Sequence, residues 1–481
     1  MPEPRYDVSL LINGVDCPAS SGAVGWRHDP VTQQATTRFA ASTVKDARLA
    51  ATAAAQAFPG WSSTPPGERR RFLLKTAECM RRRAPELEQR MQAEIGATRS
   101  WINENIELAL EILIEAASLT TQIRGQVLPS KQPQRQMLAL RQPVGAVLGI
   151  APWNAPLILG VRAVATPLAC GNTVVFKLSE LAPATQRWIA DCFQEAGLPP
   201  GVLNVISHAP DDAPAVVEAL IAHPSIRRIN FTGSTRVGRH IANTAARHLK
   251  PALLELGGKA PLLVLKDADL NAAVEAAIHG AFTNQGQICM ATDRVIVDAS
   301  IADQFCTHLA ARASALVVGD PRNPAVDLGA LATPEAGQRL MQLVEDAMRK
   351  GAQLCCGGHL LAPCLMQATV LDKVRASMSL YHEEAFGPII SVIRVSSPEE
   401  ALGVANDCEY GLSASIFSRD FNQAMKLAEK LESGICHING STVHDEAHVP
   451  FGGVKQSGYG RFGGMAGIDA FTEQRWISFQ A

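Results

Sequence analysis

Cys289 stands in an unusual setting for a cysteine that only packs. It lies in the stretch TNQGQICMATDR, between a Gly-Gln turn and a run of small polar residues. Cysteine is among the most buried residue types and usually fills space in a core. A thiol is only a few per cent ionised at neutral pH, yet its thiolate is a strong nucleophile toward a carbonyl carbon. Whether Cys289 does that chemistry depends on the groups that the fold brings beside it.

Two other polar residues lie in apolar surroundings, where their side chains need partners. Glu255 in LLELGGKAP stands between leucines and before Gly257 and Gly258. A buried carboxylate must be paired, or its pKa is raised so that it can exchange protons near neutrality. A half-exposed strand end explains the same spacing. Asn154 in APWNAP lies in an uncharged stretch between two prolines, and such a rigid amide suits a donor to an oxyanion.

Two strand ends carry groups that could bind a nucleotide. Gly233 and Gly238 lie in FTGSTRVGR, where a strand passes into a helix. This is neither the dinucleotide fingerprint nor a Walker loop, but the turn could present N–H groups to a phosphate; an ordinary tight turn is the alternative. Lys177 and Glu180 end the strand VVFKLSE. A carboxylate there can accept hydrogen bonds from a ribose 2′-OH and would repel a 2′-phosphate; a surface ion pair explains the same two residues.

The elements that must position these groups are alternating strands and helices. Short β-branched runs, including VGAVLGI, TVVFKL, RRINFTG, APLLVL and PIISVIRV, alternate with alanine-rich stretches such as LNAAVEAAIHGAF. The pattern indicates βαβ units and parallel sheets covered on both faces. We expect a helical region over 44–121 and a polar excursion at 129–136. The uncharged stretch 143–161 predicts a strand, a loop and a helix, because Pro152 and Pro156 would break a membrane-spanning helix.

Composition narrows the class of protein. The chain has 481 residues, so two or three domains are expected. A net charge of −2 argues against a nucleic-acid partner. Eleven cysteines without a CxxC pair or a visible signal peptide indicate reduced thiols in a cytoplasm. His444 and His448 lie in HDEAH, which does not match the HExxH arrangement, and no metal site is predicted.

Seven motifs together resemble those of the NAD(P)-dependent aldehyde dehydrogenase superfamily. In chain order they are APWNAP, VVFKLSE, FTGSTRVG, LLELGGKAP, NQGQICMATDR, EEAFGPI and PFGGVKQSGYGR. The resemblance runs over essentially the whole chain and implies an α/β fold with two doubly wound parallel-sheet domains and a small β extension that pairs across subunits in a homodimer or homotetramer. The division implied is an NAD-binding domain (1–124 and 143–257), a catalytic domain (258–464) and an oligomerisation extension (125–142 and 465–481).

The resemblance also implies roles for single residues. Cys289 would be the nucleophile, Asn154 with the Cys289 N–H would hold the oxyanion, and Glu255 would activate the water that hydrolyses the thioester. Lys177 and Glu180 would bind the adenosine ribose, so we expect NAD as cofactor, with NADP as a weaker alternative. The full set of expected cofactor contacts is Ile150, Pro152, Trp153, Lys177, Glu180, Gly233, Ser234, Gly257, Glu384 and Phe386.

The C-terminal stretch INGSTVHDEAHVPFGGVKQSGYGRFGG resembles the branch that oxidises salicylaldehyde, vanillin and benzaldehyde. Arg162 is the only charged residue between Arg141 and Lys177. An unpaired buried guanidinium is costly, so Arg162 should meet polar ring substituents or the product carboxylate, or else a structural acceptor. The other expected substrate contacts are Trp101, Val443 and His444; the place of Trp101 follows from the resemblance, and a position in the core explains it equally well.

Three alternative functions stay open at this point. The same mechanism serves aliphatic aldehydes and semialdehydes. A CoA-acylating enzyme would transfer the acyl group to CoA, but acylating relatives generally lack the base that Glu255 would supply. A non-catalytic relative kept for binding or structure would not need Cys289, Asn154 and Glu255 together.

Overall fold

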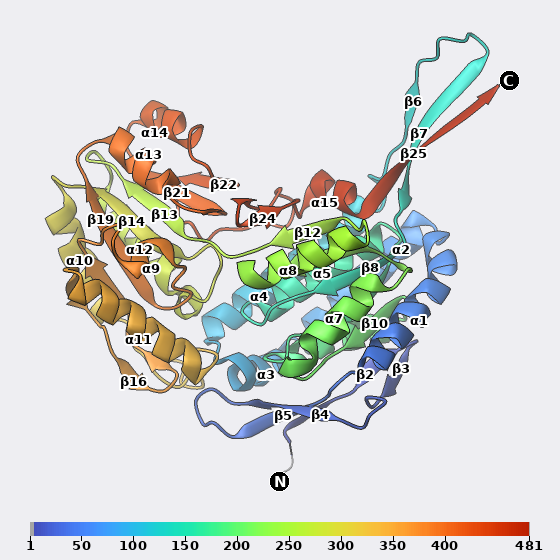
Figure 1. Ribbon diagram of the computed structural model, residues 1–481, viewed down its shortest axis with the longest axis horizontal. Helices are drawn as coiled ribbons and strands as arrows, with labels where there is room; N and C mark the ends of the chain where they lie inside the picture. The colour runs from blue at the N-terminus through green and yellow to red at the C-terminus, as the bar shows by residue number, and fades with distance from the viewer. Residues whose placement is uncertain (1–3, 481) are drawn as a thin grey trace.

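The apolar runs of the sequence form two large β-sheets with helices on their faces (Figure 1). The computed structural model describes residues 4–480. The first sheet has eight strands and the second has seven, and their inner strands run parallel, as the α/β pattern predicts. In spatial order the first sheet contains β24 (Gly458–Tyr459), β12 (Ala252–Glu255), β11 (Ile226–Thr232), β8 (Ala146–Ile150), β9 (Thr173–Lys177), β10 (Leu203–Ile206), β2 (Leu10–Ile12) and β3 (Val15–Cys17).

The register of the first sheet brings the expected site residues to one edge. Ile150 pairs with Lys177 across β8 and β9, and Thr232 pairs with Glu255 across β11 and β12. These residues end their strands, and parallel strands place their carboxyl ends at the same edge of a sheet. The loops that carry Asn154 and the cofactor motifs therefore start side by side.

Helices cover both faces of this sheet. The expected helical region at 44–121 contains four helices, and the uncharged stretch forms β8, a loop and the fully buried α5. A Cβ atom on Gly149 of β8 would lie 2.8 Å from the carbonyl oxygen of Ala163, so glycine allows α5 to pack closely there. The helices of this half are α1 (Val44–Ser62), α2 (Pro66–Arg83), α3 (Pro85–Ile95), α4 (Arg99–Leu119), α5 (Pro156–Ala169), α6 (Pro183–Glu195), α7 (Ala213–Ala222) and α8 (Thr235–Arg247).

The second sheet lies on the opposite side of the molecule in Figure 1. Its strands are β15 (Gln353–Cys356), β18 (Thr369–Asp372), β19 (Ile389–Val395), β14 (Thr292–Asp298), β13 (Ala260–Val264), β21 (Ser413–Phe417) and β22 (Ile435–Ile438). Its helices are α9 (Leu270–Phe282), α10 (Ala302–Ser314), α11 (Pro334–Arg349), α12 (Ser379–His382), α13 (Pro398–Asn406) and α14 (Phe421–Ala428). The loop that carries Cys289 leads directly into β14, so this sheet holds the C-terminal end of the cysteine loop.

A narrow three-stranded sheet projects from the body (Figure 1). It consists of β6 (Gln126–Leu128), β7 (Arg135–Pro143) and β25 (Thr472–Gln480), and β25 pairs with the whole length of β7. The polar stretch at 129–136 connects β6 to β7, as the expected excursion. Before β25, helix α15 (Gly464–Phe471) packs against α4 and α5.

Smaller strands and short helices complete the fold. One additional sheet is formed by β1 (Tyr6–Val8), β5 (Ala35–Ala40) and β4 (Val24–His28). Two-stranded pairs are β16 (Leu360–Ala362) with β17 (Leu365–Met366), and β20 (Tyr410–Gly411) with β23 (Val454–Lys455). The short 3₁₀ helices are η1 (Pro210–Asp212) and η2 (Thr283–Gly286).

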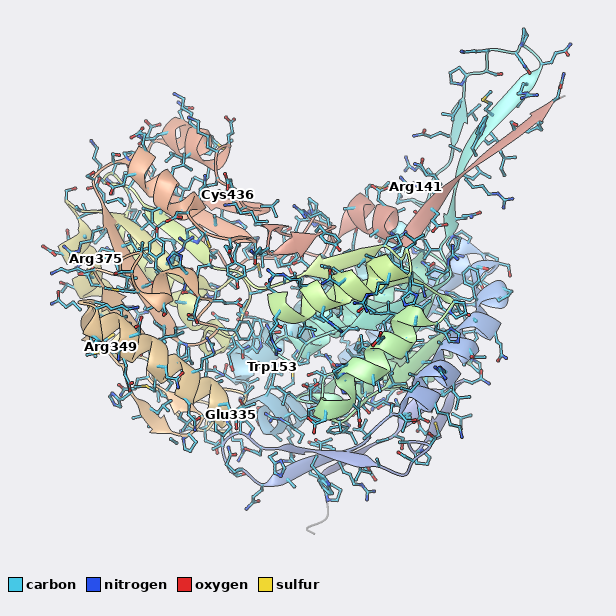
Figure 2. All side chains as sticks on the ribbon, in the orientation of Figure 1. Arg141, Trp153, Glu335, Arg349, Arg375 and Cys436 are labelled. Atoms are coloured by element: carbon cyan, nitrogen blue, oxygen red, sulfur yellow. The ribbon has the colours of Figure 1, made fainter. Side chains whose placement is uncertain are left out.

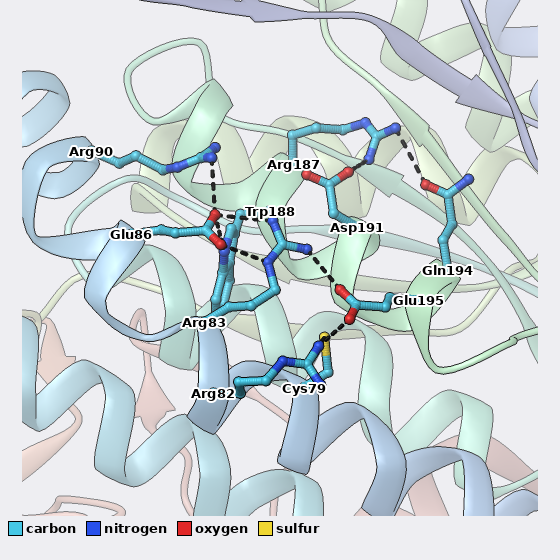
Figure 3. A network of polar contacts seen from close by, with 10 residues as sticks. All are labelled: Cys79, Arg82, Arg83, Glu86, Arg90, Arg187, Trp188, Asp191, Gln194 and Glu195. Atoms are coloured by element: carbon cyan, nitrogen blue, oxygen red, sulfur yellow. Dashed lines mark hydrogen bonds and ion pairs between the residues drawn. The ribbon is translucent and has the colours of Figure 1, made fainter.

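The charged segments of the N-terminal helices form a network across α2, α3 and α6 (Figure 3). Arg83 pairs with Glu86 at 2.7 Å and with Glu195 at 3.2 Å. Trp188 donates from Nε1 to Glu86 at 3.1 Å. Because these groups are partly exposed, each pair adds at most about 1 kcal/mol, and their main effect is to align the three helices.

The helices, cysteines and metal-binding side-chain types of residues 4–480 have three further properties. None of these helices combines the length and the apolar character needed to cross a membrane. All eleven cysteines lie within these residues and are free thiols. No group of histidine, cysteine and carboxylate side chains in this range is arranged to hold a metal ion.

Candidate active site

Cys289 lies where two cavities meet. One cavity, of about 280 Å³, opens toward α4 and α5. The other, of about 470 Å³, lies between the carboxyl edge of the first sheet and the loop after α12. Cys289 and Asn154 line both cavities. A molecule in either cavity can therefore reach the thiol from its own side.

The loop before Cys289 is held by amide side chains. Asn284 and Gln285 have positive φ angles of 49° and 57°. The Asn284 amide donates to the Asn154 carbonyl at 3.0 Å, and the Gln285 amide donates to the Ala330 carbonyl at 3.0 Å. These bonds stabilise a backbone shape that non-glycine residues rarely adopt. The sequence prediction missed this role of the TNQGQ stretch.

Hydrogen bonds hold Asn154 both at its side chain and at its backbone. Its Nδ2 donates to the Gln287 carbonyl at 2.9 Å, and its backbone carbonyl accepts from the Trp101 indole at 2.9 Å. Because a carboxamide has two N–H groups, one remains for a ligand oxygen. The side chain is buried, so that donor is fixed before any ligand arrives.

Glu255 ends β12 and is only 2% exposed. Its Oε1 accepts from the Gly453 N–H at 3.2 Å, and its Oε2 has no hydrogen-bond partner in the described chain. Burial raises the pKa of this carboxyl to about 8, against the opposing effects of Arg162 and the Gly453 N–H. The carboxylate can therefore take up and release a proton near neutral pH, as the apolar setting predicts.

The Cys289 thiol is held in its protonated form. Burial raises its pKa, and the nearby carboxylates Glu255 and Glu384 raise it further. The thiolate must therefore form when a substrate is present, with a base to accept the proton. Glu255, with one free oxygen, is the neighbouring group that can do this.

The larger cavity contains most of the expected cofactor contacts. They are Pro152, Trp153, Gly233, Ser234, Gly257, Glu384 and Phe386. Figure 2 shows Trp153 in the region between the two large sheets. Ile150, Lys177 and Glu180 do not line this cavity but lie along the same sheet edge.

Glycines make room for Glu384 in this cavity. A Cβ atom on Gly257 would lie 2.5 Å from the Glu384 Oε2. Glu384 Oε1 accepts from the Gly258 N–H at 2.9 Å, and burial raises the pKa of Glu384 to about 7. Arg339, which the sequence prediction missed, lines the cavity and donates to the Glu384 carbonyl at 3.1 Å.

Lys177 and Glu180 form a second polar group at this edge. The Lys177 Nζ lies 3.9 Å from the Glu180 Oε2, and burial lowers the pKa of Lys177. His208 lies close enough to be affected: burial and then the Lys177 charge lower its pKa to about 4. Sequence analysis did not identify His208, which carries no recognisable motif.

The smaller cavity contains all four expected substrate contacts, Trp101, Arg162, Val443 and His444. Arg162 is not free, because its Nη2 pairs with Asp445 Oδ2 at 2.5 Å. Asp445 is therefore the structural acceptor that the sequence left open as one alternative for Arg162. Asp445 also lines the cavity, and sequence analysis missed it although it lies in the HDEAH stretch considered for metal binding.

The rest of this cavity is apolar inside and acidic toward α4. Its apolar lining includes Leu108, Ile158, Leu159, Ile288, Met290 and Phe451. Glu104, Glu107 and Glu111 come from one face of α4. The apolar lining, to which Trp101 and Phe451 contribute aromatic side chains, suits an apolar ring.

A family model described as "Aldehyde dehydrogenase family" matches residues 20–477. The chain belongs to the aldehyde dehydrogenase family. The vanillin dehydrogenase of Pseudomonas fluorescens is 57% identical, covering 98% of both chains. A benzaldehyde dehydrogenase [NAD(+)] of Pseudomonas putida is 42% identical over 90% of this chain and 88% of its own. The crystal structure of a salicylaldehyde dehydrogenase from Pseudomonas putida G7, complexed with salicylaldehyde, has a TM-score of 0.97 and 48% identity, covering 99% of this chain and 98% of that chain.

These matches confirm the fold and the reaction class that the motif series implies. The enzyme is an aldehyde-oxidising oxidoreductase that uses NAD(P). The residues present fit that cofactor, because the larger cavity reaches Cys289 and contains most of the expected cofactor contacts, and the missing side chain of Gly257 leaves room for the Glu384 carboxylate at its wall.

Proposed function

We propose that the enzyme oxidises an aromatic aldehyde, of the salicylaldehyde, vanillin or benzaldehyde type, to the carboxylic acid with NAD. The observation that carries this proposal is that Cys289 lines both a cavity with an apolar, aromatic wall and a larger cavity that contains most of the expected cofactor contacts. The names of the relatives support the aromatic class.

The first step is attack of the Cys289 sulfur on the aldehyde carbon. A C–S bond forms, the C=O bond opens to an oxyanion, and the thiol proton passes to Glu255. The free N–H of Asn154, with the Cys289 backbone N–H, stabilises that oxyanion. Losing one such donor typically lowers the rate by about 100- to 1,000-fold.

When bound, the nicotinamide supplies the acceptor for the hydride that leaves the former aldehyde carbon. Trp153, Glu384 and Phe386 would hold its ring and ribose, and Lys177 with Glu180 would hold the adenosine ribose. The carbon left on Cys289 is then a thioester. Glu255 first releases the thiol proton to solvent. It then removes a proton from water as the water attacks that thioester, and the carboxylic acid leaves as Cys289 departs as a thiolate, which regains its proton from Glu255.

The same proposal covers the organisation of the enzyme. Residues 1–124 and 143–257 form the cofactor domain, 258–464 the catalytic domain, and 125–142 with 465–481 an extension that joins subunits in a homodimer or homotetramer; of these, 1–3 and 481 lie outside the described residues. The eleven free thiols support a reducing, cytoplasmic location.

An aldehyde panel with NAD, followed by NADH absorbance, tests the function. We expect benzaldehyde-type substrates to exceed acetaldehyde by at least about tenfold in kcat/KM, from their extra apolar contact. Cys289→Ala should lose turnover and keep NAD binding. Faster oxidation of short aliphatic aldehydes would overturn the aromatic assignment, and a requirement for CoA would favour the acylating alternative.

A further inference from the structure

We propose that Asp445 is a positioning residue that controls the proton chemistry of Glu255 and Cys289 by neutralising the guanidinium of Arg162 beside them. The inference deepens the proposed function and rests on its assignment of Cys289 as nucleophile and Glu255 as base. Asp445 itself need not contact the reacting atoms.

The first observation is the isolation of the ion pair. The side chains of Arg162 and Asp445 are only 5% and 7% exposed. The guanidinium carbon lies 4.5 Å from the centre of the Phe451 ring and 5.6 Å from that of Phe462. Aromatic faces and a single carboxylate therefore surround the positive charge, and water screens it little.

The second observation is that the same loop holds both Arg162 and Glu255. Asp445 pairs with Arg162, and eight residues later the Gly453 N–H donates to Glu255. Arg461 donates to the Gly453 carbonyl at 2.7 Å and fixes that backbone from the other side. The loop thus sets the position of the arginine and of the carboxylate at once.

The third observation is a pair of unsatisfied oxygens. Glu255 Oε2 and Asp445 Oδ1 are both buried without a hydrogen-bond partner among residues 4–480. Arg162 bonds to the other oxygen of Asp445 and is, with Arg461, one of the two cations that act on Glu255. Its pairing with Asp445 leaves the Glu255 oxygen free to accept a proton, whereas an Arg162 released from Asp445 would bond to Glu255 and keep it ionised.

The charged groups that face the two reacting side chains are few. Arg162, Arg461 and Asp445 act on Glu255, while Glu255, Glu384, Arg162 and Asp445 act on Cys289. In both cases Arg162 lowers the pKa, and Asp445 raises it. The two charges therefore act in opposite directions, and removing one member exposes the charge of the other.

The test is a double-mutant cycle with Asp445→Asn, Arg162→Gln and the double variant. Two pH profiles are measured for each: kcat/KM for benzaldehyde, and the rate of Cys289 alkylation by iodoacetamide, with Cys289→Ala to subtract the other thiols. Alkylation reports the thiolate fraction without any turnover. Tm and NADH binding identify variants that fold.

We expect the pH profiles of the two single variants to shift in opposite directions and the profiles of the double variant to return toward those of the wild type. Asp445→Asn should move the ascending limb of both profiles down by about one pH unit, and Arg162→Gln should move both up by a similar amount, as expected for a unit charge several ångströms away. The double variant should lie near the wild type, slightly above it, because Arg162 has the larger effect of the two.

A purely structural pair gives a different result. If the Arg162–Asp445 pair only stabilises the fold, the single variants have a lower Tm, but the ascending limbs of both pH profiles stay where they are in the wild type. That outcome overturns the inference. If one single variant fails to fold, the other single variant still tests the inference. Adding the second substitution to it must return the ascending limb of its pH profile toward the wild-type position. A wild-type enzyme without NAD-dependent aldehyde oxidation would instead contradict the proposed function, and the alkylation profiles would still test the ion pair.

Discussion

At the scale of single residues, Glu255 shows how burial converts an ordinary carboxylate into a base for neutral solution. Its pKa of about 8 comes mainly from burial, and one oxygen remains without a partner. Only the ionised form can accept a proton from water. Base catalysis by this group is therefore present above about pH 8 and is lost as the pH falls through that value.

Glu255→Gln should lower kcat by about 100-fold or more, because a carboxamide of the same shape cannot accept the proton. The limb near pH 8 should disappear from the kcat profile. The first turnover should still release NADH, but more slowly than in the wild type, because Glu255 also accepts the thiol proton in the proposed first step. Stopped-flow NADH absorbance separates that first turnover from steady state. Glu335→Gln, an exposed glutamate on α11, is the matched control, and wild-type steady-state turnover in Glu255→Gln would show that another group activates the water.

Glu180 should favour NAD over NADP, because its carboxylate would face the 2′-phosphate of NADP. Glu180→Gln removes that repulsion, so the kcat/KM ratio of NAD to NADP should fall by about tenfold. Lys177, 3.9 Å away, keeps the wild-type preference partial. A wild-type ratio of one or less contradicts this interpretation of Glu180.

The sequence predicted the residues whose local surroundings are unusual and missed those defined by distant partners. Cys289, Glu255 and Asn154 each contrast with their own neighbours in the chain. Asp445 pairs with Arg162 across 283 positions, and no local pattern marks that contact. The roles of all these residues remain predictions, while their placement around one thiol is a property of the structure.

At the scale of elements, the position of the loop that carries Cys289 depends on close packing against the backbone at Gly258. A Cβ atom on Gly258 would lie 2.2 Å from the Cys289 carbonyl oxygen. Glycine there lets the start of β13 touch the loop. The alternation of strands and helices could be predicted from hydrophobic periodicity, but the positive φ angles of Asn284 and Gln285 could not, because tertiary amide hydrogen bonds stabilise them.

Gly258→Ala should displace the Cys289 loop and lower kcat/KM by at least about tenfold, because small errors in position cost large factors in rate. The Gly258 N–H that holds Glu384 would shift with it. Gly403→Ala in α13 is the matched control, since a Cβ atom there meets nothing within 4 Å. Benzaldehyde kinetics and Tm of both variants check the prediction, and unchanged kinetics in Gly258→Ala would show that the loop adapts.

At the scale of the whole molecule, the projecting sheet exposes apolar side chains that the body does not cover. Trp476 and Phe479 on β25 are 67% and 48% exposed, and Val127 on β6 is 73% exposed. β25 also lies at the edge of its sheet, with one side of its backbone unpaired in the described chain. Exposed edges and exposed apolar side chains of this kind are typical of interaction surfaces. Composition marked only the polar, proline-containing stretch at 129–136 as an excursion. The pairing of that extension with the C-terminal strand was predicted only through the family resemblance.

Replacing Trp476 and Phe479 with glutamate should dissociate the enzyme into monomers of 51.3 kDa, because four or more buried charges cannot be accommodated where apolar side chains meet. Light scattering after size-exclusion chromatography measures the mass of each species. Phe421→Glu is the matched control, since Phe421 is 62% exposed on α14, away from the projecting sheet. Cys289, Asn154 and Glu255 all come from one chain, so the monomer should still form NADH. A wild-type enzyme that already runs as a monomer would contradict the role of the sheet.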